Sequence, residues 1–223
     1  MKVKNKEIIA FKKKLEKAGI KGLALDIDET LSFTIGLMVQ RLIDEVGNPE
    51  NLTALEIAKK YKHTDNIPYW QNDLAKKIIY DINCSDETMR DLPLIENAKE
   101  VVNKINKIIP IVAYITVRSE YIRNGTQFWL DKHGFPKAEL INRPFGVERK
   151  DGNKWKAGVL EDLYPQIIGI VDDNPGLVDF LSKDYKGTVY MYDNKETKRN
   201  DIKVIPCGTW DDVEKEIIGD RDL

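Results

Sequence analysis

Two aspartates flank a single isoleucine directly after an apolar run near the amino end. The run is Gly-Leu-Ala-Leu at 22–25, and Asp26-Ile27-Asp28 follows it. Side chains alternate between the two faces of a strand, so both carboxylates are expected on the same side. At ~4 Å and an effective dielectric constant of ~20, two such charges repel by ~4 kcal/mol. A divalent cation or a shared proton would offset this repulsion, and an acidic turn on the surface is the alternative.

Polar residues also follow two later apolar runs, at 109–115 and 167–171, and a helix predicted to precede the second run begins with lysines. In open α/β sheets, ligands bind outside the carboxyl ends of the strands. A right-handed crossover brings the amino end of the connecting helix to the same edge. We therefore expect one crevice that contains Asp26, Asp28, Thr116, Arg118, Lys154, Lys156, Asp172 and Asp173.

These residue types suit phosphoryl transfer. A carboxylate can attack phosphorus and form an aspartyl phosphate. Mg²⁺ prefers hard oxygen ligands and would neutralise both the carboxylates and the phosphate. A hydroxyl and an ammonium group can bind the equatorial phosphate oxygens, and a second carboxyl can act as general acid and base.

The remaining pattern indicates an α/β core. Near-continuous apolar strands that alternate with helices are typical of a parallel sheet covered on both faces, here a doubly wound sheet. The expected strands are 22–27, 109–115, 138–142, 167–171 and 187–192, and the expected helices are 4–18, 94–108, 119–133, 155–163 and 174–183.

Residues 32–92 interrupt this alternation. They contain helical patterns at 36–46, 51–61 and 66–80 but no convincing strand, and they are too many for a loop. We expect a small helical insertion above the sheet, so that 1–31 and 93–223 form the core domain. Aromatic residues within it, Tyr61, Tyr69 and Trp70, would form the insertion's own core or stack on a flat substrate.

Composition limits the classes of partner. The 223 residues are 32% charged but carry a net charge of only −2, which gives no overall attraction to nucleic acid or to an anionic membrane. Two cysteines are too few for a disulfide framework or a cysteine zinc site, which favours a reducing cytoplasm. No segment approaches the ~20 apolar residues of a membrane span. The sequence indicates no oligomeric state.

The four motifs, taken in order, resemble those of the haloacid dehalogenase (HAD) superfamily. They are Asp-x-Asp-x-Thr after the first strand, a threonine after a later strand, a lysine, and Asp-Asp after another strand, and they span essentially the whole chain. The resemblance implies a Rossmann-like fold in which 32–92 is a type-one helical cap. It also implies a Mg²⁺-dependent phosphatase that hydrolyses phosphate monoesters.

The resemblance further implies a role for each motif residue. Asp26 would be the nucleophile and Asp28 the general acid and base, with the backbone carbonyl of Asp28 also on the magnesium. Thr116 would bind the transferring phosphate. Apart from the resemblance, Arg118 would reach the phosphate or a substrate charge, or form a surface ion pair. Asp26 and Asp172 would complete the metal site, with Asp173 beside them either as a ligand or as a support for the ligands. Either Lys156 or Lys154 would steady the phosphate and the nucleophile.

Helical periodicity favours Lys156 over Lys154. Lys156, Leu160 and Leu163 are spaced i, i+4 and i+7, so they lie on one helix face that must turn toward the core. The other lysine points elsewhere if the helix includes it. The alternative for either lysine is an ordinary exposed position at a helix start.

Three functions agree with these residues. The first is a phosphatase of small phosphate esters, with nucleotides as the first expectation for the substrate. The segments 126–130 and 142–144 are more loosely similar to nucleotidases and polynucleotide-end phosphatases, so a 3′-phosphatase of polynucleotide ends is the second. The third is a non-catalytic signalling domain whose aspartate accepts phosphate without turnover.

Overall fold

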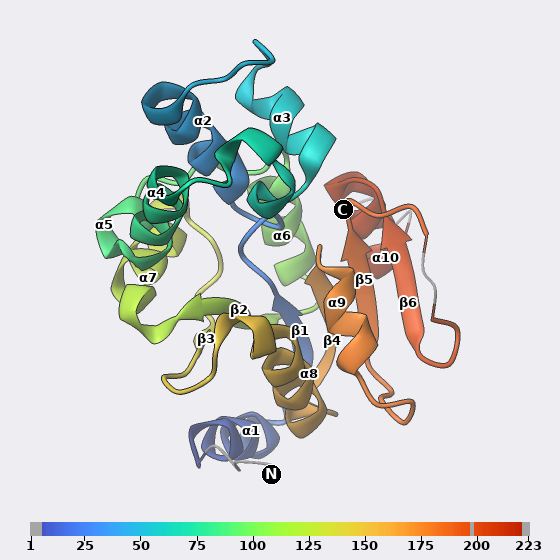
Figure 1. The fold of residues 1–223 in the computed structure, drawn as a ribbon. Helices are drawn as coiled ribbons and strands as arrows, with labels where there is room; N and C mark the ends of the chain where they lie inside the picture. Colours follow the sequence, from blue (N-terminus) through green and yellow to red (C-terminus); the bar gives the residue numbers. More distant parts are fainter. Residues whose placement is uncertain (1–5, 197–198, 220–223) are drawn as a thin grey trace.

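A six-stranded sheet forms the centre of the protein, in a computed structural model that describes residues 6–196 and 199–219. The strand order is β3-β2-β1-β4-β5-β6, and every adjacent pair is parallel (Figure 1). The predicted Rossmann-like α/β class is therefore confirmed. The strands are β1 (Gly22–Leu25), β2 (Ile111–Ser119), β3 (Glu139–Arg143), β4 (Ile167–Asp172), β5 (Thr188–Tyr192) and β6 (Lys203–Cys207).

The strand order makes β1 and β4 neighbours although most of the chain separates them. The chain passes from β1 through β2 to β3 on one side, and then returns to place β4 on the other side of β1. The ladder continues beyond β1, because the Asp26 N–H donates to the Val171 carbonyl at 2.9 Å. Ligands bind where the strand order reverses in sheets of this kind, which here is the carboxyl edge of β1 and β4.

Helices cover both faces of this sheet. Leu23 and Leu25 of β1 belong to the apolar cluster that contains α6, α7 and α10, whereas Ala24 belongs to the cluster with α1, α8 and α9. This alternation follows directly from the two-residue period of a strand. The bounds are α1 (Lys6–Ala18), α6 (Ala98–Asn106), α7 (Arg123–His133), α8 (Gly152–Leu163), α9 (Pro175–Phe180) and α10 (Trp210–Ile218).

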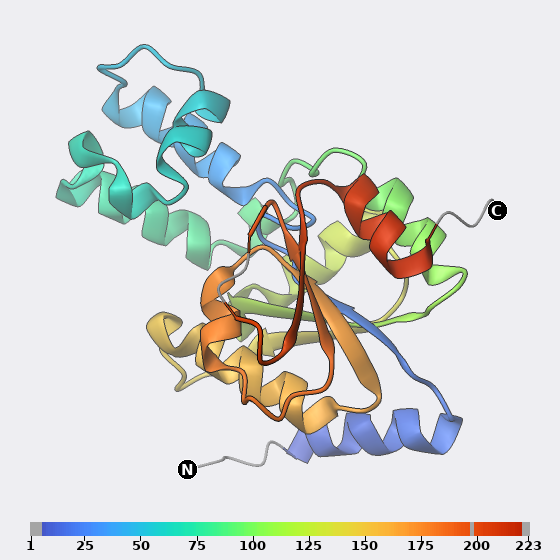
Figure 2. The same cartoon turned by 90° about the vertical axis from the view of Figure 1, so that its right-hand side faces the viewer.

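The chain between β1 and β2 is helical. Its helices are α2 (Thr34–Val46), α3 (Ala54–Tyr61), α4 (Asp73–Cys84) and α5 (Asp86–Met89), with 3-10 turns at Thr64–Asn66 and Pro68–Trp70. Helices α2, α3 and α4 lie together at one end of the molecule, away from the helices that cover the sheet (Figure 2). Trp70 is buried among them and its Nε1 donates to the Gly47 carbonyl at 2.9 Å, so this ring is part of the core.

Several predicted boundaries are wrong. The helix expected at 66–80 begins only at Asp73, because Pro68 opens a 3-10 turn and the Asn72 side chain caps α4 by accepting the Ala75 N–H at 2.9 Å. Strand β2 does not end at residue 115 but continues to Ser119, because β3 pairs with it that far. Strand β6 and helix α10 were not predicted. Residues 4 and 5 of the first predicted helix lie outside the described residues.

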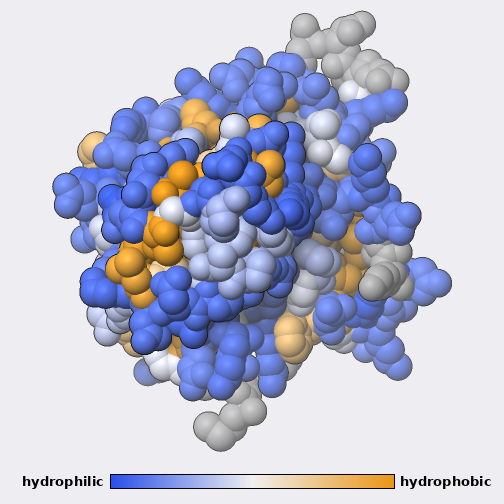
Figure 3. Space-filling view, turned by 45° about the horizontal axis from the view of Figure 1, so that its top comes forward, coloured by the Kyte–Doolittle hydropathy of each residue, from blue (hydrophilic) through white to orange (hydrophobic). Residues whose placement is uncertain are grey.

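The surface is mainly polar. The face drawn in Figure 3 is mostly hydrophilic, with hydrophobic residues in small separate groups. Within residues 6–196 and 199–219, no helix combines the length and the apolar character needed to cross a bilayer.

Candidate functional site

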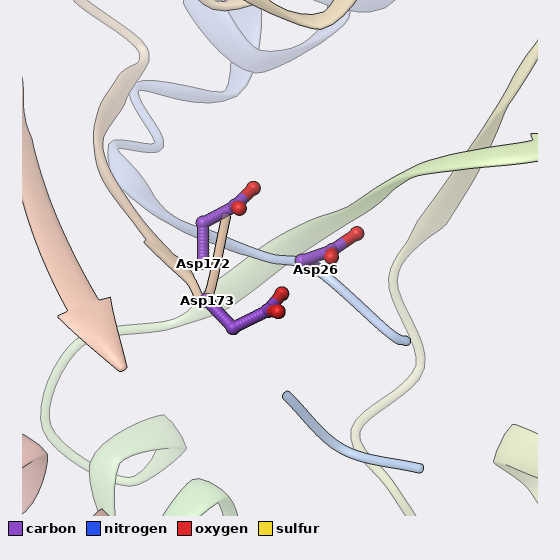
Figure 4. Close-up of side chains that lie close together, drawn as sticks. All are labelled: Asp26, Asp172 and Asp173. Atoms are coloured by element: carbon purple, nitrogen blue, oxygen red, sulfur yellow. The ribbon is translucent and has the colours of Figure 1, made fainter. Parts of the chain in front are cut away.

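Three aspartates meet at the carboxyl edge of the sheet. Asp26 directly follows β1, Asp172 is the last residue of β4, and Asp173 follows it. One carboxylate oxygen from each lies within 4.8 Å of the others, and Figure 4 shows the three side chains gathered there. We call these residues the acidic cluster. The predicted meeting of Asp26 with Asp172 is therefore observed, and it follows from the pairing of β1 with β4.

Lys156 is the cation of this site. It lies on α8 with only 1% of its side chain exposed, and its Nζ is 2.7 Å from Asp26 Oδ1 and 2.8 Å from Asp172 Oδ2. Lys154, two residues earlier on the same helix, is exposed. Of the two candidate lysines, Lys156 is therefore the one that contacts the carboxylates. A catalytic role for this lysine stays a prediction.

The charges of these four groups do not balance. Three ionised carboxylates and one ammonium group carry a net charge of −2. Burial raises the pKa of Asp26 to about 7, although Lys156 opposes the shift, and the charge of Asp172 adds to it. Burial, together with Asp26 and Asp172, also raises the pKa of Asp173 well above its usual value. A divalent cation with a preference for hard oxygen ligands fits this donor set and would relieve its excess negative charge.

Asp28 is paired differently. Its Oδ1 accepts a hydrogen bond from Arg118 Nη2 at 2.8 Å and one from the Thr34 hydroxyl at 2.6 Å, and Arg118 Nε lies 3.1 Å from both oxygens. Burial alone would raise the pKa of Asp28, but Arg118 and Thr34 outweigh it and lower that pKa. Asp28 still acts on Asp26, because its charge adds to the rise in the pKa of Asp26, but Asp172 has the larger effect. The carboxylates that gather most closely with Asp26 are those of Asp172 and Asp173.

Arg118 is an internal residue and does not form a surface ion pair. Its side chain is 3% exposed, and it also donates to the Ser32 hydroxyl at 2.9 Å and to Thr126 Oγ1 at 3.3 Å. Thr116, two residues earlier, is fully buried within β2, and its hydroxyl accepts the Arg118 N–H at 3.1 Å. A phosphate-binding role for either residue stays a prediction.

Solved structures with the same arrangement of elements are HAD-superfamily hydrolases. One is from Ehrlichia chaffeensis, with a TM-score of 0.50 and 14% identity over 89% of this chain and 97% of that chain. The fold of this chain is therefore similar to that of HAD-superfamily hydrolases. A second structure, the HAD-hydrolase YfnB of Bacillus subtilis bound to magnesium, has a TM-score of 0.50 and 12% identity over 89% of this chain and 98% of that chain. No protein-family model and no curated protein matches the sequence.

In this HAD-like fold, the loop after β1 forms hydrogen bonds to the start of α2, to the residue after β4 and to α10. Glu29 adopts a positive φ of 54°, and its carboxylate accepts the Ile35 N–H at the start of α2 at 2.6 Å. The Thr30 hydroxyl donates to Asp173 at 3.3 Å, and Trp210 Nε1 of α10 donates to the Thr30 carbonyl at 2.9 Å. Glu29 therefore shapes the turn. The contribution of Trp210 was missed.

Two cavities adjoin each other at Asp28, and one of them reaches the acidic cluster. The first, which we call the polar cavity, has a volume of about 330 Å³ and is lined by Asp26, Asp173 and Lys156 among others. The second, the aromatic cavity, has a volume of about 630 Å³. The residues that line both cavities are Asp28, Thr34, Asp65, Asn83, Val117 and Arg149.

Proposed function

We propose that the protein is a Mg²⁺-dependent phosphomonoesterase that acts through an aspartyl phosphate on Asp26. The observation that carries this proposal is the setting of that carboxylate. It follows the central strand of a HAD-like sheet, contacts Lys156 at 2.7 Å, lies in a cluster with Asp172 and Asp173, and lines an open cavity. The fold likeness to HAD hydrolases supports hydrolysis as the reaction.

In the first step, an Asp26 oxygen would attack phosphorus, so that an Asp26–phosphorus bond forms as the ester bond to the leaving oxygen breaks. Lys156 holds the Asp26 carboxylate in place and can bind a phosphate oxygen as charge develops there. Mg²⁺, held by the acidic cluster and the Asp28 backbone carbonyl, would offset the negative charge of the carboxylates and the phosphate.

Asp28 would serve both steps. Its carboxyl would protonate the leaving oxygen, and it would then take a proton from the water that hydrolyses the aspartyl phosphate. Arg118 favours the ionised form of Asp28, which is the form that the second step requires. The pairing therefore supports the role of Asp28 as base most directly.

We also propose that residues 32–92 act as a cap over the core formed by 1–31 and 93–223. Side chains of this segment, such as Met38 and Lys62, line the polar cavity together with Asp26 and Lys156. Movement of the segment would therefore open or close the cavity and exclude water during the reaction. The substrate would be a small phosphate ester, with nucleotides first, in a reducing cytoplasm that suits the two free cysteines.

A panel of phosphate esters, assayed with Mg²⁺ and with a chelator, tests this function. We expect Mg²⁺-dependent release of phosphate, and a loss of about 10³-fold or more in kcat for Asp26→Asn, because the nucleophile is removed. Circular dichroism should show that this variant is folded, and Asp179→Asn, an exposed aspartate of α9, is the matched control.

Two results would contradict the proposal. One is activity that survives either the chelator or Asp26→Asn. The other is a phosphorylated protein that stays stable for hours without turnover, because that would support the non-catalytic phospho-accepting domain instead.

A further inference from the structure

The most exposed large hydrophobic side chains of the described residues gather in one place. Tyr121 is 73% exposed, Tyr80 is 68% exposed and Phe145 is 57% exposed, and all three line the aromatic cavity. Single exposed hydrophobic residues are ordinary on a protein surface, whereas a group of them around a cavity marks a binding site. Ile79, Met89 and Ile122 add apolar side chains to the same lining.

The three rings come from different parts of the chain. Tyr80 lies on α4, Tyr121 lies in the 3-10 turn that follows β2, and Phe145 lies in the loop after β3. The rings of Tyr121 and Phe145 meet edge to face, with centroids 4.3 Å apart. The Phe145 N–H also donates to the Glu120 carboxylate at 3.3 Å, which ties the two loops together. These rings are held beside the cavity by local contacts while their faces stay largely exposed.

The aromatic cavity adjoins the polar cavity, in which the reaction would take place. It shares lining residues with the polar cavity, among them Asp28, the residue that would protonate the leaving oxygen. A phosphate at Asp26 would therefore have its leaving group directed toward the aromatic cavity. The volume of about 630 Å³ is within the range of small-molecule sites, roughly 300–1,000 Å³.

We propose that the aromatic cavity is the leaving-group site and that it takes a nucleoside, so that the substrate is a nucleoside monophosphate. This inference rests on the proposed phosphatase function for the position of the phosphate. The flat nucleobase would stack on the exposed faces of Tyr121, Phe145 or Tyr80, because base–aromatic stacking needs an open ring face. Arg149 lines both cavities, which places a cation where the sugar and the phosphate of such a substrate would meet.

Cys84 provides a test of the site that needs no turnover. This thiol is exposed and lines the aromatic cavity, whereas Cys207, the other cysteine, is buried. We expect saturating nucleosides, tested as adenosine, guanosine, cytidine and uridine, to slow alkylation of Cys84 by iodoacetamide about tenfold for at least one base. Ribose alone should give no protection. Phe145→Ala should abolish the protection, and Phe128→Ala should keep it, because Phe128 is similarly exposed but does not line either cavity.

Steady-state kinetics give the second test. Phe145→Ala and Tyr121→Ala should each raise KM for the preferred nucleoside monophosphate about tenfold, as loss of one stacking contact predicts. KM for glycerol 2-phosphate should rise far less than KM for the nucleotide, because that ester has no ring to stack. Phe128→Ala should leave KM unchanged for both substrates.

The outcomes separate the two proposals. Normal hydrolysis of glycerol 2-phosphate, with no nucleoside protection and no effect of the ring variants on nucleotides, would overturn the nucleoside site and leave the phosphatase standing. Protection of Cys84 by nucleosides, without hydrolysis of any ester, would support the site and contradict the phosphatase. A strong preference for 3′-phosphorylated oligonucleotides over all nucleoside monophosphates would also overturn the nucleoside site.

Discussion

The acidic cluster with Lys156 and the neighbouring aromatic cavity are built in opposite ways. Asp172 and Lys156 are 0% and 1% exposed and belong to β4 and α8, whereas the rings of the aromatic cavity are the most exposed large hydrophobic side chains described. Groups that take part in bond making need fixed positions, which a packed sheet edge provides. The groups that would choose among substrates under our proposal lie on a helix and two loops, where substitution costs little folding energy.

The largest expected effect concerns the buried lysine. Lys156→Met should lower the free energy of unfolding of the metal-free protein by about 3–5 kcal/mol, because it leaves buried carboxylates without their cation. Urea denaturation measures this loss. Lys154→Met on the same helix is the matched control and should stay within about 0.5 kcal/mol, because Lys154 is exposed. Equal losses of unfolding free energy in Lys156→Met and Lys154→Met would contradict the claim that the buried lysine stabilises the acidic cluster.

The second effect concerns affinity for the metal. Asp172→Asn should weaken Mg²⁺ binding about 100-fold or more, because substitution of groups that only support metal ligands already costs about 10–100-fold. Isothermal titration calorimetry would measure the affinity, with Asp179→Asn as control. Unchanged affinity in Asp172→Asn would place the magnesium away from the acidic cluster.

The third effect is a dependence of stability on pH. The pKa of Asp26 is about 7 in the folded protein and 3.8 in the unfolded reference, so between these values the folded state binds more protons. Stability that Asp26 contributes at low pH should therefore be lost as the pH rises from about 4 to 7. Metal-free Asp26→Asn should show a shallower fall over this range in thermal denaturation. An identical slope in both proteins would exclude Asp26 as the titrating group.

The smallest effect concerns the stability of the aromatic cavity. Phe145→Ala should change the free energy of unfolding by less than about 1 kcal/mol, because the ring is 57% exposed and little of its burial is lost. The same variant is expected to raise KM for nucleotides. A large loss of stability would mean that the ring serves packing, and the contrast between the two regions would fail.

Sequence alone was sufficient for the acidic cluster because regular structure positions it. Asp26 and Asp172 each end a buried apolar run, and parallel strands bring their carboxyl ends to one edge. Lys156 could be favoured because its spacing to Leu160 and Leu163 follows the helix period. These deductions use only local patterns and a general rule of topology.

The remaining features depend on contacts that no local pattern encodes. The pairing of Asp28 with Arg118 joins residues far apart in sequence, and so does the grouping of Tyr80, Tyr121 and Phe145. Strand β6 was missed because it is a short edge strand that contains Pro206, which argues against a strand by its pattern. A signal for α10 was present, since Thr209 and Asp212 form a capping box.

The hydrogen bond from Trp210 to the Thr30 carbonyl has a consequence for synthesis in the cell. It joins the loop that follows the first strand to helix α10, 180 residues later in the sequence. A growing polypeptide on the ribosome cannot form this contact until residue 210 has emerged from the exit tunnel. Under the proposed function, chains that stall before Trp210 has emerged should therefore be inactive.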